Sequence, residues 1–286
     1  MQLLSGKKVA EEMYEKLQGD IAALKEKGVD PKLVIILVGE NAASLSYIKS
    51  KRKAAEKVGI EEELITYAEN DIDTERLIAK IHELNEDASV HGILVQLPLP
   101  KHIYEPDVIK AIMPAKDVDG FTAYNIGKMF LSTDFEDLAP CTPLGVIHIL
   151  ESYNLDIEGK EAVVVGRSNI AGKPLALMLL NRGATVTVCH SKTKDVAAHT
   201  KNADILVSAV GKINFITEDM VKEGATVIDI GINRNDEGRI VGDVNFENVS
   251  KKTSYITPVP GGCGLMTVAC LMENVYKAAL KQTNQS

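Results

Sequence analysis

The 286-residue sequence lacks the signatures of several large classes of protein. Its four cysteines form no C-x-x-C pair and its six histidines form no H-E-x-x-H, so neither a disulfide framework nor a metal site is expected. No apolar run approaches the length of a membrane span, and Lys7-Lys8 open an amphipathic helix rather than the apolar core of a signal peptide. We therefore expect a cytoplasmic protein that has no membrane partner.

The charge balance and the lack of internal repeats narrow the class further. A formal net charge of −8 argues against a nucleic-acid groove or an anionic membrane surface as the main partner. No repeat of fixed period and no low-complexity segment interrupts the chain. Hydrophobic residues make up 45% of a chain of this length, which is enough for two substantial cores, and two domains are expected.

Buried strand patterns alternate with amphipathic helices along the whole chain, which predicts the α/β class with parallel sheets. We expect an N-terminal three-layer α/β catalytic domain, residues 1–140 and 266–286, and a C-terminal Rossmann-like domain, residues 141–265. The last helix, near 265–280, would pack back on the first domain. The predicted strands lie near 33–38, 61–67, 91–95, 162–166, 185–189, 205–209 and 227–230, and the main helices near 7–27, 42–58, 73–86, 105–112 and 143–153.

A tyrosine and a lysine four residues apart are the most informative feature of the first half. Apolar residues recur at helical spacing over 42–58, directly after the strand pattern of 33–38. Tyr47 and Lys51 therefore share a helix face just beyond the carboxyl end of a strand, where open α/β sheets bind ligands. An isolated lysine on such a helix is more often a solvated charge, so its significance depends on neighbouring segments.

Two further segments bring polar side chains to the same edge of the sheet. The strand pattern of 91–95 ends at Gln96 and is followed by two prolines, so the chain leaves the sheet there with an amide facing the crevice. The run from Lys116 to Gly120 presents Asp119 from a turn in which the glycine can take a positive φ. Alternatively, this run forms only a surface turn.

Together these segments resemble the signatures of the methylenetetrahydrofolate dehydrogenase/methenyltetrahydrofolate cyclohydrolase family. The resemblance covers nearly the whole chain, and further motifs stand in the family's order. It implies a bifunctional, NADP-dependent enzyme of one-carbon metabolism and purine biosynthesis that acts on tetrahydrofolate derivatives and forms a homodimer. The further motifs are Pro140-Cys141-Thr142-Pro143, Gly166-Arg167-Ser168 with Gly172-Lys173-Pro174, Asp229-Ile230-Gly231-Ile232-Asn233 and Pro258-Val259-Pro260-Gly261-Gly262.

The resemblance also implies roles for individual residues of the substrate site. Lys51 would be the acid/base of the hydrolytic step, and Gln96 would orient its amine. Tyr47 would stack on the folate ring system, and Asp119 would accept two N–H bonds from the pterin edge. Gly262 lies in a segment that would cross both ligands, although a rigid linker between domains is the plainer alternative.

A second candidate site follows the strand pattern of 162–166. The turn that contains Gly166, Arg167 and Ser168 opens a helix, as a dinucleotide-binding turn does, although it is not a G-x-G-x-x-G. Backbone N–H groups at the start of such a helix can hold a phosphate. The family's order adds Thr142 and Ile232 to the expected cofactor contacts. A second explanation for Thr142, which precedes Pro143, is that it caps the helix near 143–153.

The residues after the next strand favour NADP over NAD. An NAD site usually places a carboxylate there on the ribose 2′-hydroxyl, but this chain reads Cys189-His190-Ser191-Lys192-Thr193. A carboxylate would repel a 2′-phosphate, whereas Arg167 can hold it in a fork, with Ser191 opposite. Alternatively, Ser191 only caps the helix that begins near Lys194.

Two other functions remain open at the level of sequence. The first is another NADP-dependent oxidoreductase of the amino-acid-dehydrogenase-like architecture, for example one that acts on a shikimate-type acid. It would need a lysine–aspartate pair at a hydroxyl, which Tyr47, Lys51 and Gln96 fit less well. The second is a non-catalytic module that senses NADP, which would have no need for polar residues at the strand ends of the first domain.

Overall fold

The structure, a computed structural model, has the α/β class predicted from the sequence. It describes residues 1–283, apart from the side chains of Ala42 and Ala43. The chain divides into two compact units, which we call unit 1 and unit 2. Unit 1 comprises Met1–Glu11, Met129–Thr133 and Pro140–Thr267, and unit 2 comprises Glu12–Lys128, Asp134–Ala139 and the chain from Val268 on.

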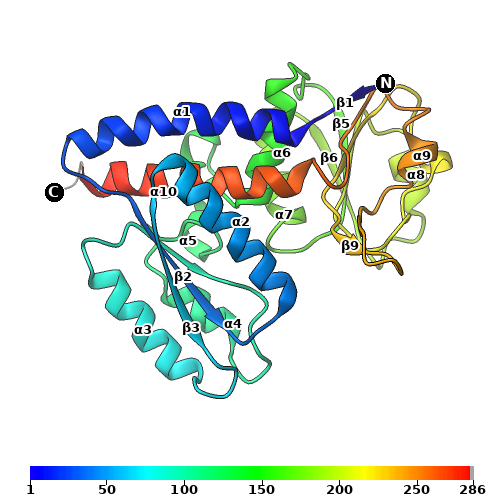
Figure 1. Ribbon diagram of the computed structural model, residues 1–286. Coiled ribbons are helices and arrows are strands. Elements are labelled where there is room, and N and C mark those ends of the chain that lie inside the picture. Colours follow the sequence, from blue (N-terminus) through cyan, green and yellow to red (C-terminus); the bar gives the residue numbers. More distant parts are fainter. Residues whose placement is uncertain (284–286) are drawn as a thin grey trace. The chain divides into compact units, whose positions relative to one another are not determined.

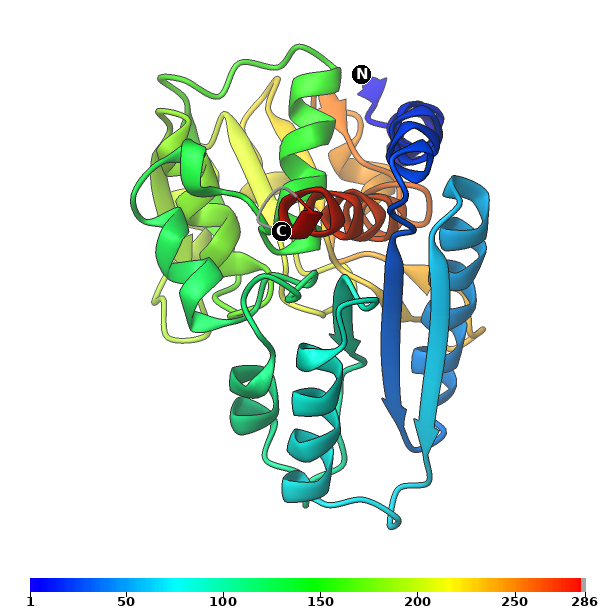
Figure 2. The ribbon, with the colours of Figure 1, turned by 90° about the vertical axis from the view of Figure 1, so that its left-hand side faces the viewer.

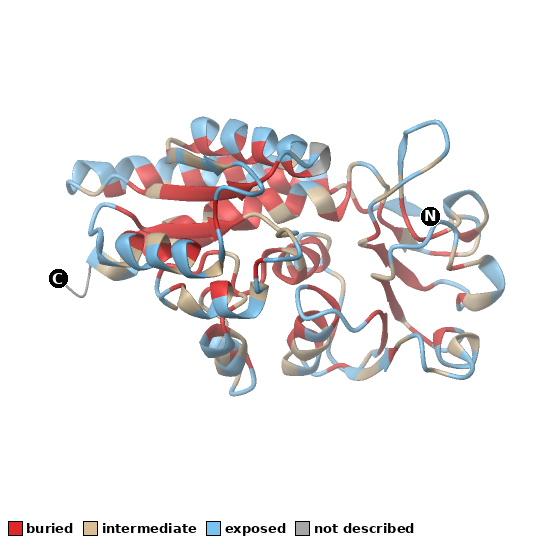
Figure 3. Ribbon diagram, turned by 90° about the horizontal axis from the view of Figure 1, so that it is seen from below, coloured by how far each residue is buried: buried red, intermediate tan, exposed pale blue. Residues whose placement is uncertain are grey.

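Unit 2 is built around a three-stranded parallel sheet (Figure 1). Its strands are β2 (Lys32–Val38), β3 (Glu61–Tyr67) and β4 (Gly92–Val95), in the order β3-β2-β4. The central strand β2 is buried along almost its whole length (Figure 3), as its continuous apolar run predicts. β2 and β3 lie side by side (Figure 2) and pair in register from Lys32 and Glu61 onward.

Helices cover this sheet and complete its core. One face of the sheet carries Val34 and Ile36 into a cluster with Leu77 and Ile81 of α3 (Thr74–Glu86) and with residues of α4 (Glu105–Ala111). The connection from β2 to β3 contains α2 (Ala42–Val58), whose bounds match the prediction. Four further elements belong wholly or mostly to unit 2: α1 (Gly6–Glu26), α5 (Ala123–Met129), η1 (Thr133–Phe135) and α10 (Cys263–Thr283). The residues of α1 up to Glu11 and those of α10 up to Thr267 belong to unit 1.

Unit 1 is built around a six-stranded, all-parallel sheet. Its order is β1-β11-β8-β7-β5-β6. The strands are β1 (Gln2–Leu3), β5 (Glu161–Val165), β6 (Thr185–Cys189), β7 (Ile205–Ser208), β8 (Thr226–Asp229) and β11 (Tyr255–Ile256). The other elements are α6 (Cys141–Ser152), α7 (Gly172–Asn181), α8 (Val196–Thr200), η2 (Glu218–Met220), β9 (Asn233–Arg234), β10 (Ile240–Val241) and α9 (Phe246–Val249).

Both sheets have a topological switch point, and these points locate the candidate sites. In unit 2 the chain passes from β2 to β3 on one side and then to β4 on the other, so the loops after β2 and β4 diverge. In unit 1 it passes from β5 to β6 and then crosses to β7, so the loops after β5 and β7 diverge. Diverging loops leave a crevice at the carboxyl ends of the strands, where open α/β sheets bind ligands.

The structure corrects two helix starts and adds short strands. The helix expected near 143–153 begins at Cys141, and its N-cap is Pro140, so Thr142 is not the cap. The last helix begins at Cys263 rather than near residue 265. β1 and β11 were not expected, and they pair at one edge of the sheet of unit 1. No helix within residues 1–283 is long and apolar enough to span a membrane.

Candidate active site

Lys51 and Gln96 meet at the switch point of unit 2. Lys51 lies on α2, which follows β2, and Gln96 is the residue directly after β4. The lysine Nζ donates a hydrogen bond of 2.9 Å to Gln96 Oε1, and the lysine is only 8% exposed. The amide Nε2 donates to the carbonyl oxygen of Leu97 at 2.8 Å, which fixes the amide with its oxygen toward the lysine. Lys51 is therefore a buried, oriented amine rather than a solvated surface charge.

Tyr47 lies one helical turn before Lys51 on α2. Its ring is partly buried, and burial raises the pKa of its hydroxyl above the ordinary value. The residue thus stays neutral over the physiological range. Its four-residue spacing from Lys51 puts the two residues on one face of α2.

Asp119 lies in a buried turn beside β4 rather than in a surface loop. Asp117 forms an isolated parallel bridge with Ile93 of β4, and Asp119 follows two residues later in the turn. Gly120 has a φ of 71°, as the sequence predicts for this turn. Lys116, Asp117 and Val118 are buried, so the turn is not on the surface, whereas the role of Asp119 stays a prediction.

The two carboxylates of this turn have different surroundings. Asp117 is 1% exposed and accepts hydrogen bonds from the backbone of Phe121 and Thr122 and from Asn125 Nδ2. Asp117 thus holds the shape of the turn. Asp119 is only partly buried.

The second candidate site lies at the switch point of unit 1. Gly166 follows β5 with a φ of 129°, and a Cβ placed on it would overlap the carbonyl oxygen of Ala209, which follows β7. A Cβ on Gly172, the first residue of α7, would overlap the carbonyl oxygen of Gly166. The two glycines therefore allow the turn to close tightly against the start of α7, while Arg167 and Ser168 remain exposed.

The turn after β6 begins beside this one. β5 and β6 are paired at Val165 and Cys189, so the residues that follow them leave the sheet next to each other. Ser191 is exposed. It does not cap α8, because Asp195 is the N-cap and accepts from the backbone N–H of Ala198. The helix-cap explanation for Ser191 is therefore wrong.

The other predicted site residues lie elsewhere in unit 1. Ile232 follows β8 and is 47% exposed. The Thr142 hydroxyl lies 2.9 Å from the hydroxyl of Thr267. Gly262 is buried in a turn so tight that a Cβ would come within 2.6 Å of the Pro258 carbonyl oxygen. Gly262 belongs to unit 1, whereas Lys51 and its neighbours belong to unit 2.

The sequence analysis did not predict a role for two buried carboxylates of unit 1. Asp229 ends β8 and is 4% exposed, and Asp243 follows β10 and is fully buried. Burial is the main reason that the pKa of Asp229 is raised to about 6. Asp229 was visible as part of a motif at a strand end, but no spacing in the sequence links it to a residue 14 positions later.

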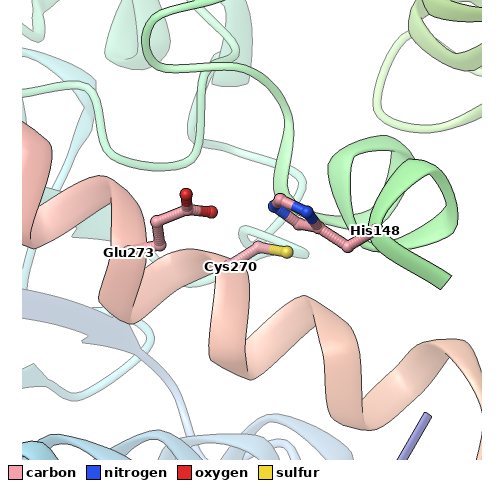
Figure 4. A group of neighbouring side chains, drawn as sticks. All are labelled: His148, Cys270 and Glu273. Atoms are coloured by element: carbon pink, nitrogen blue, oxygen red, sulfur yellow. The ribbon is translucent and has the colours of Figure 1, made fainter. Parts of the chain in front are cut away.

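Three further side chains could suggest a metal ligand set. Figure 4 labels His148 on α6 and Cys270 and Glu273 on α10. Cys270 is fully buried, and burial raises the pKa of its thiol well above the ordinary value, which disfavours the thiolate that binds metals. Glu273 pairs with Lys277 at 2.9 Å. His148 belongs to a different unit from the other two, and no metal is assigned to them.

Family models match both halves of the chain. Residues 4–119 match the catalytic domain of tetrahydrofolate dehydrogenase/cyclohydrolase, and residues 140–283 match its NAD(P)-binding domain. The chain belongs to the tetrahydrofolate dehydrogenase/cyclohydrolase family. The resemblance inferred from the motifs is thereby confirmed, as are the two expected kinds of domain.

Curated relatives and solved structures agree with the family models. The bifunctional protein FolD of Nautilia profundicola is 53% identical over 98% of this chain and 97% of its own length. The crystal structure of FolD from Campylobacter jejuni is 52% identical, with a TM-score of 0.96 and coverage of 98% of this chain and 99% of that one. Trypanosoma brucei FolD, solved with NADP and an inhibitor, is 36% identical, with a TM-score of 0.94 and coverage of 99% and 98%.

The shikimate-type alternative has only a likeness of fold. Shikimate 5-dehydrogenase from Thermus thermophilus is 14% identical, with a TM-score of 0.53 and coverage of 87% of this chain and 99% of that one. Sequence identity as low as this shows a shared fold and does not indicate the substrate. Membership of the tetrahydrofolate dehydrogenase/cyclohydrolase family therefore replaces this alternative, and it makes the chain an enzyme rather than a non-catalytic sensor.

Proposed function

We propose that this enzyme oxidises 5,10-methylenetetrahydrofolate to 5,10-methenyltetrahydrofolate with NADP and hydrolyses the product to 10-formyltetrahydrofolate. The observation that carries the proposal is the buried Lys51 amine, bonded to Gln96 at a strand switch point. Family membership supports both activities. Such an enzyme would serve one-carbon metabolism, including purine biosynthesis, in the cytoplasm.

In the substrate site, Tyr47 stacks on the folate ring system and Asp119 accepts two N–H bonds from the pterin edge. Tyr47 lies on α2, which follows β2, and Asp119 lies in the turn whose Asp117 bridges to Ile93 of β4, so both come from segments next to the same small sheet. An aromatic face and a carboxylate together bind a flat, N–H-rich ring and fix its orientation. Gly262 contributes backbone rather than a side chain to the substrate.

Orientation is the main task of the protein in the oxidative step. The cation left on the methylene carbon is stabilised by its two neighbouring nitrogens, so no protein charge is needed for it. Holding the reacting groups in a near-attack arrangement can lower the barrier by about 7–11 kcal/mol. NADP, when bound, accepts the hydride.

The hydrolytic step requires proton transfers, and Lys51 supplies them. Water adds to the methenyl carbon, and a ring nitrogen must gain a proton as the tetrahedral adduct collapses. Lys51 Nζ takes and returns the proton in this sequence. Gln96 holds the amine in place, because its oxygen accepts from Nζ while its own amide N–H is bound to Leu97.

The residues at the switch point of unit 1 fit NADP. The glycine turn of Gly166 and Gly172 leaves room for the dinucleotide backbone to approach the start of α7. Arg167 and Ser191, both exposed on adjacent turns, hold the 2′-phosphate. Ser168, Ile232 and Thr142 complete the proposed contacts.

The proposed domain division and oligomeric state extend this assignment. The proposed catalytic domain comprises residues 1–140 and 266–286, although β1 at its start pairs into the six-stranded sheet of unit 1, and the proposed NADP-binding domain comprises residues 141–265. Of these, residues 284–286 lie outside the described part of the chain. We propose a homodimer through β6, which forms an open edge of the six-stranded sheet.

Replacement of Lys51 by methionine separates the two activities. Lys51→Met keeps the volume and the apolar stem but removes the proton-transferring amine. Cyclohydrolase activity should fall by about 100-fold or more, in the range of general acid–base contributions, while part of the dehydrogenase activity remains. Both rates are measured by absorbance with 5,10-methylenetetrahydrofolate and NADP, following reduced cofactor and methenyl product at separate wavelengths.

Lys53→Met is the matched control. Lys53 is an exposed lysine on the same helix, and its replacement should leave both rates unchanged. Full cyclohydrolase activity in Lys51→Met would overturn the acid/base assignment. Absence of cofactor reduction by the unaltered protein would overturn the proposed function itself.

A further inference from the structure

The carboxylate of Asp243, in unit 1, accepts five hydrogen bonds. It is fully buried. Oδ2 accepts hydrogen bonds from Ser208 Oγ at 3.1 Å and from the backbone N–H groups of Val210 at 2.7 Å and Gly211 at 3.2 Å. Oδ1 accepts from Lys212 N and from Asn233 Nδ2, both at 2.9 Å.

These donors come from two stretches of chain next to the proposed cofactor site. Ser208 ends β7 and the segment from Val210 to Lys212 follows it, with Ala209 against Gly166 at the switch point. Asn233 follows Ile232 and is the first residue of β9, after the loop that leaves β8. A single carboxylate thus sets the backbone path after β7 and the direction of a side chain after β8.

The position of Asp243 is itself fixed by the second buried carboxylate. Asp229 Oδ1 accepts from the backbone N–H of Asp243 at 3.0 Å, and Oδ2 accepts from that of Val244 at 2.8 Å. A Cβ on Gly231 would overlap the Asp243 side chain, and a Cβ on Gly242 would overlap that of Asp229. The geometry therefore leaves Asp243 little freedom to shift.

The five hydrogen bonds compensate for an otherwise costly buried charge. An ionised carboxylate is stable in the interior only when its oxygens accept several hydrogen bonds or pair with a cation. All five donors here are neutral groups, and three of them are backbone N–H groups of one loop. The carboxylate therefore fixes the conformation of this loop in addition to any contribution to stability.

We propose that Asp243 is a positioning residue for the dinucleotide site, which rests on the NADP-dependent function proposed above. It does not touch the cofactor. It holds residues 209–212 and Asn233 in the conformation that accepts the dinucleotide next to the Gly166 turn. Loss of the carboxylate should therefore weaken cofactor binding and leave hydrolysis, which needs no cofactor, unaffected.

Asp243→Asn tests the proposal because it keeps the shape but turns one acceptor oxygen into an N–H donor. Calorimetric titration with NADP should show a Kd raised by about 10-fold or more, since at least two donors lose their acceptor. The KM for NADP should rise in parallel. Hydrolysis of 5,10-methenyltetrahydrofolate without NADP should keep the kcat of the unaltered enzyme.

Two companion variants separate positioning from general damage. Asp236→Asn changes an exposed aspartate in the β9–β10 turn and should leave Kd and KM unchanged. Ser208→Ala removes one side-chain donor to Asp243 and should raise the Kd for NADP about 3-fold. This variant tests the positioning role if Asp243→Asn does not fold.

A Kd within 2-fold of the unaltered value in Asp243→Asn, with only the melting temperature lowered, would overturn the proposal, since a purely structural role predicts that result. If Asp243→Asn does not fold, an unchanged Kd in Ser208→Ala would do the same. The unaltered enzyme, measured alongside, shows whether NADP-dependent oxidation occurs at all, so failure of the proposed function is recognised separately.

Discussion

Individual polar residues in this enzyme have one of two roles, which their hydrogen-bond partners distinguish. Asp117 and Asp243 accept bonds from nearby backbone N–H groups and fix the shape of loops. Lys51 donates to another side chain at a strand end, and its role in proton transfer is the one we propose. Sequence spacing pointed to Lys51 and Gln96, because strand ends can be recognised in a sequence. It did not find the role of Asp243, because its donors lie 10 to 35 positions away.

Asp229 makes stability depend on pH in an unusual direction. Burial raises the pKa of its carboxyl from 3.8 to about 6, with the neighbouring charge of Asp243 adding to the effect. Between these pH values the folded chain holds a proton that the unfolded chain has released. The free energy of unfolding should therefore fall by about 3 kcal/mol in all from this group as the pH rises from below about 3 to above about 7, with about 2 kcal/mol of that fall between pH 4 and pH 6.

Two measurements check this expectation. Carbon-13 NMR of the Asp229 carboxyl should give a titration midpoint near 6, and urea unfolding at a series of pH values should show the decline. Groups whose pKa is lowered, such as the Asp137 carboxyl beside Lys128 and Lys281, lose their contribution only at more acidic pH. A midpoint below 4 for Asp229 would contradict the argument.

At the scale of elements, the sequence predicts those with a strong periodic pattern and misses the short ones. The bounds of α2, β3 and β6 match their predicted ranges to the residue. Two-residue strands such as β1 and β11 have no periodicity of their own and form only because the growing sheet offers a free edge. The start of α6 was misplaced because a Thr-Pro pair is typical of a helix N-terminus, whereas Pro140 occupies the cap position.

The junction of β5 and α7 should tolerate no side chain at Gly172. Gly172→Ala would drive its methyl group into the Gly166 carbonyl oxygen and open the turn. We expect the Kd for NADP to rise by about 10-fold or more while cyclohydrolase activity is retained. Titration calorimetry and the cofactor-free hydrolysis assay measure the two effects.

Gly19→Ala serves as the control for this change. Gly19 lies within α1 with no other group within 4 Å of the added methyl. Because alanine favours a helix more than glycine does, this variant should keep both activities and gain up to about 1 kcal/mol of stability. Wild-type affinity for NADP in Gly172→Ala would show that the tight turn is unnecessary.

At the scale of the whole molecule, the open edge of the six-stranded sheet predicts self-association. β6 is paired with β5 on one side only, and Val188 on it is 37% exposed. Light scattering at micromolar concentration should give twice the chain mass of 31.0 kDa. Val188→Lys should yield the monomer, because a lysine on an edge strand opposes pairing with another strand.

Ile240→Lys is the matched control for the dimer. Ile240 is 39% exposed on β10, outside the six-stranded sheet, and its replacement should leave the dimer intact. A monomeric unaltered protein, or a Val188→Lys variant that remains dimeric, would contradict an interface through β6.

The Asp229–Asp243 pair also limits how the chain can be recombined with its relatives. The loop after β7 donates to a carboxylate encoded more than 30 positions later, just after the β9–β10 hairpin outside the main sheet. Consider a chimera that exchanges the first strands and turns of the NADP-binding domain and ends before Gly242. Its loop after β7 would come from one parent, and the carboxylate of residue 243 that accepts from this loop would come from the other. Functional crossover points should therefore lie after Val244, so that the loop after β7 and the Asp229–Asp243 pair come from the same parent.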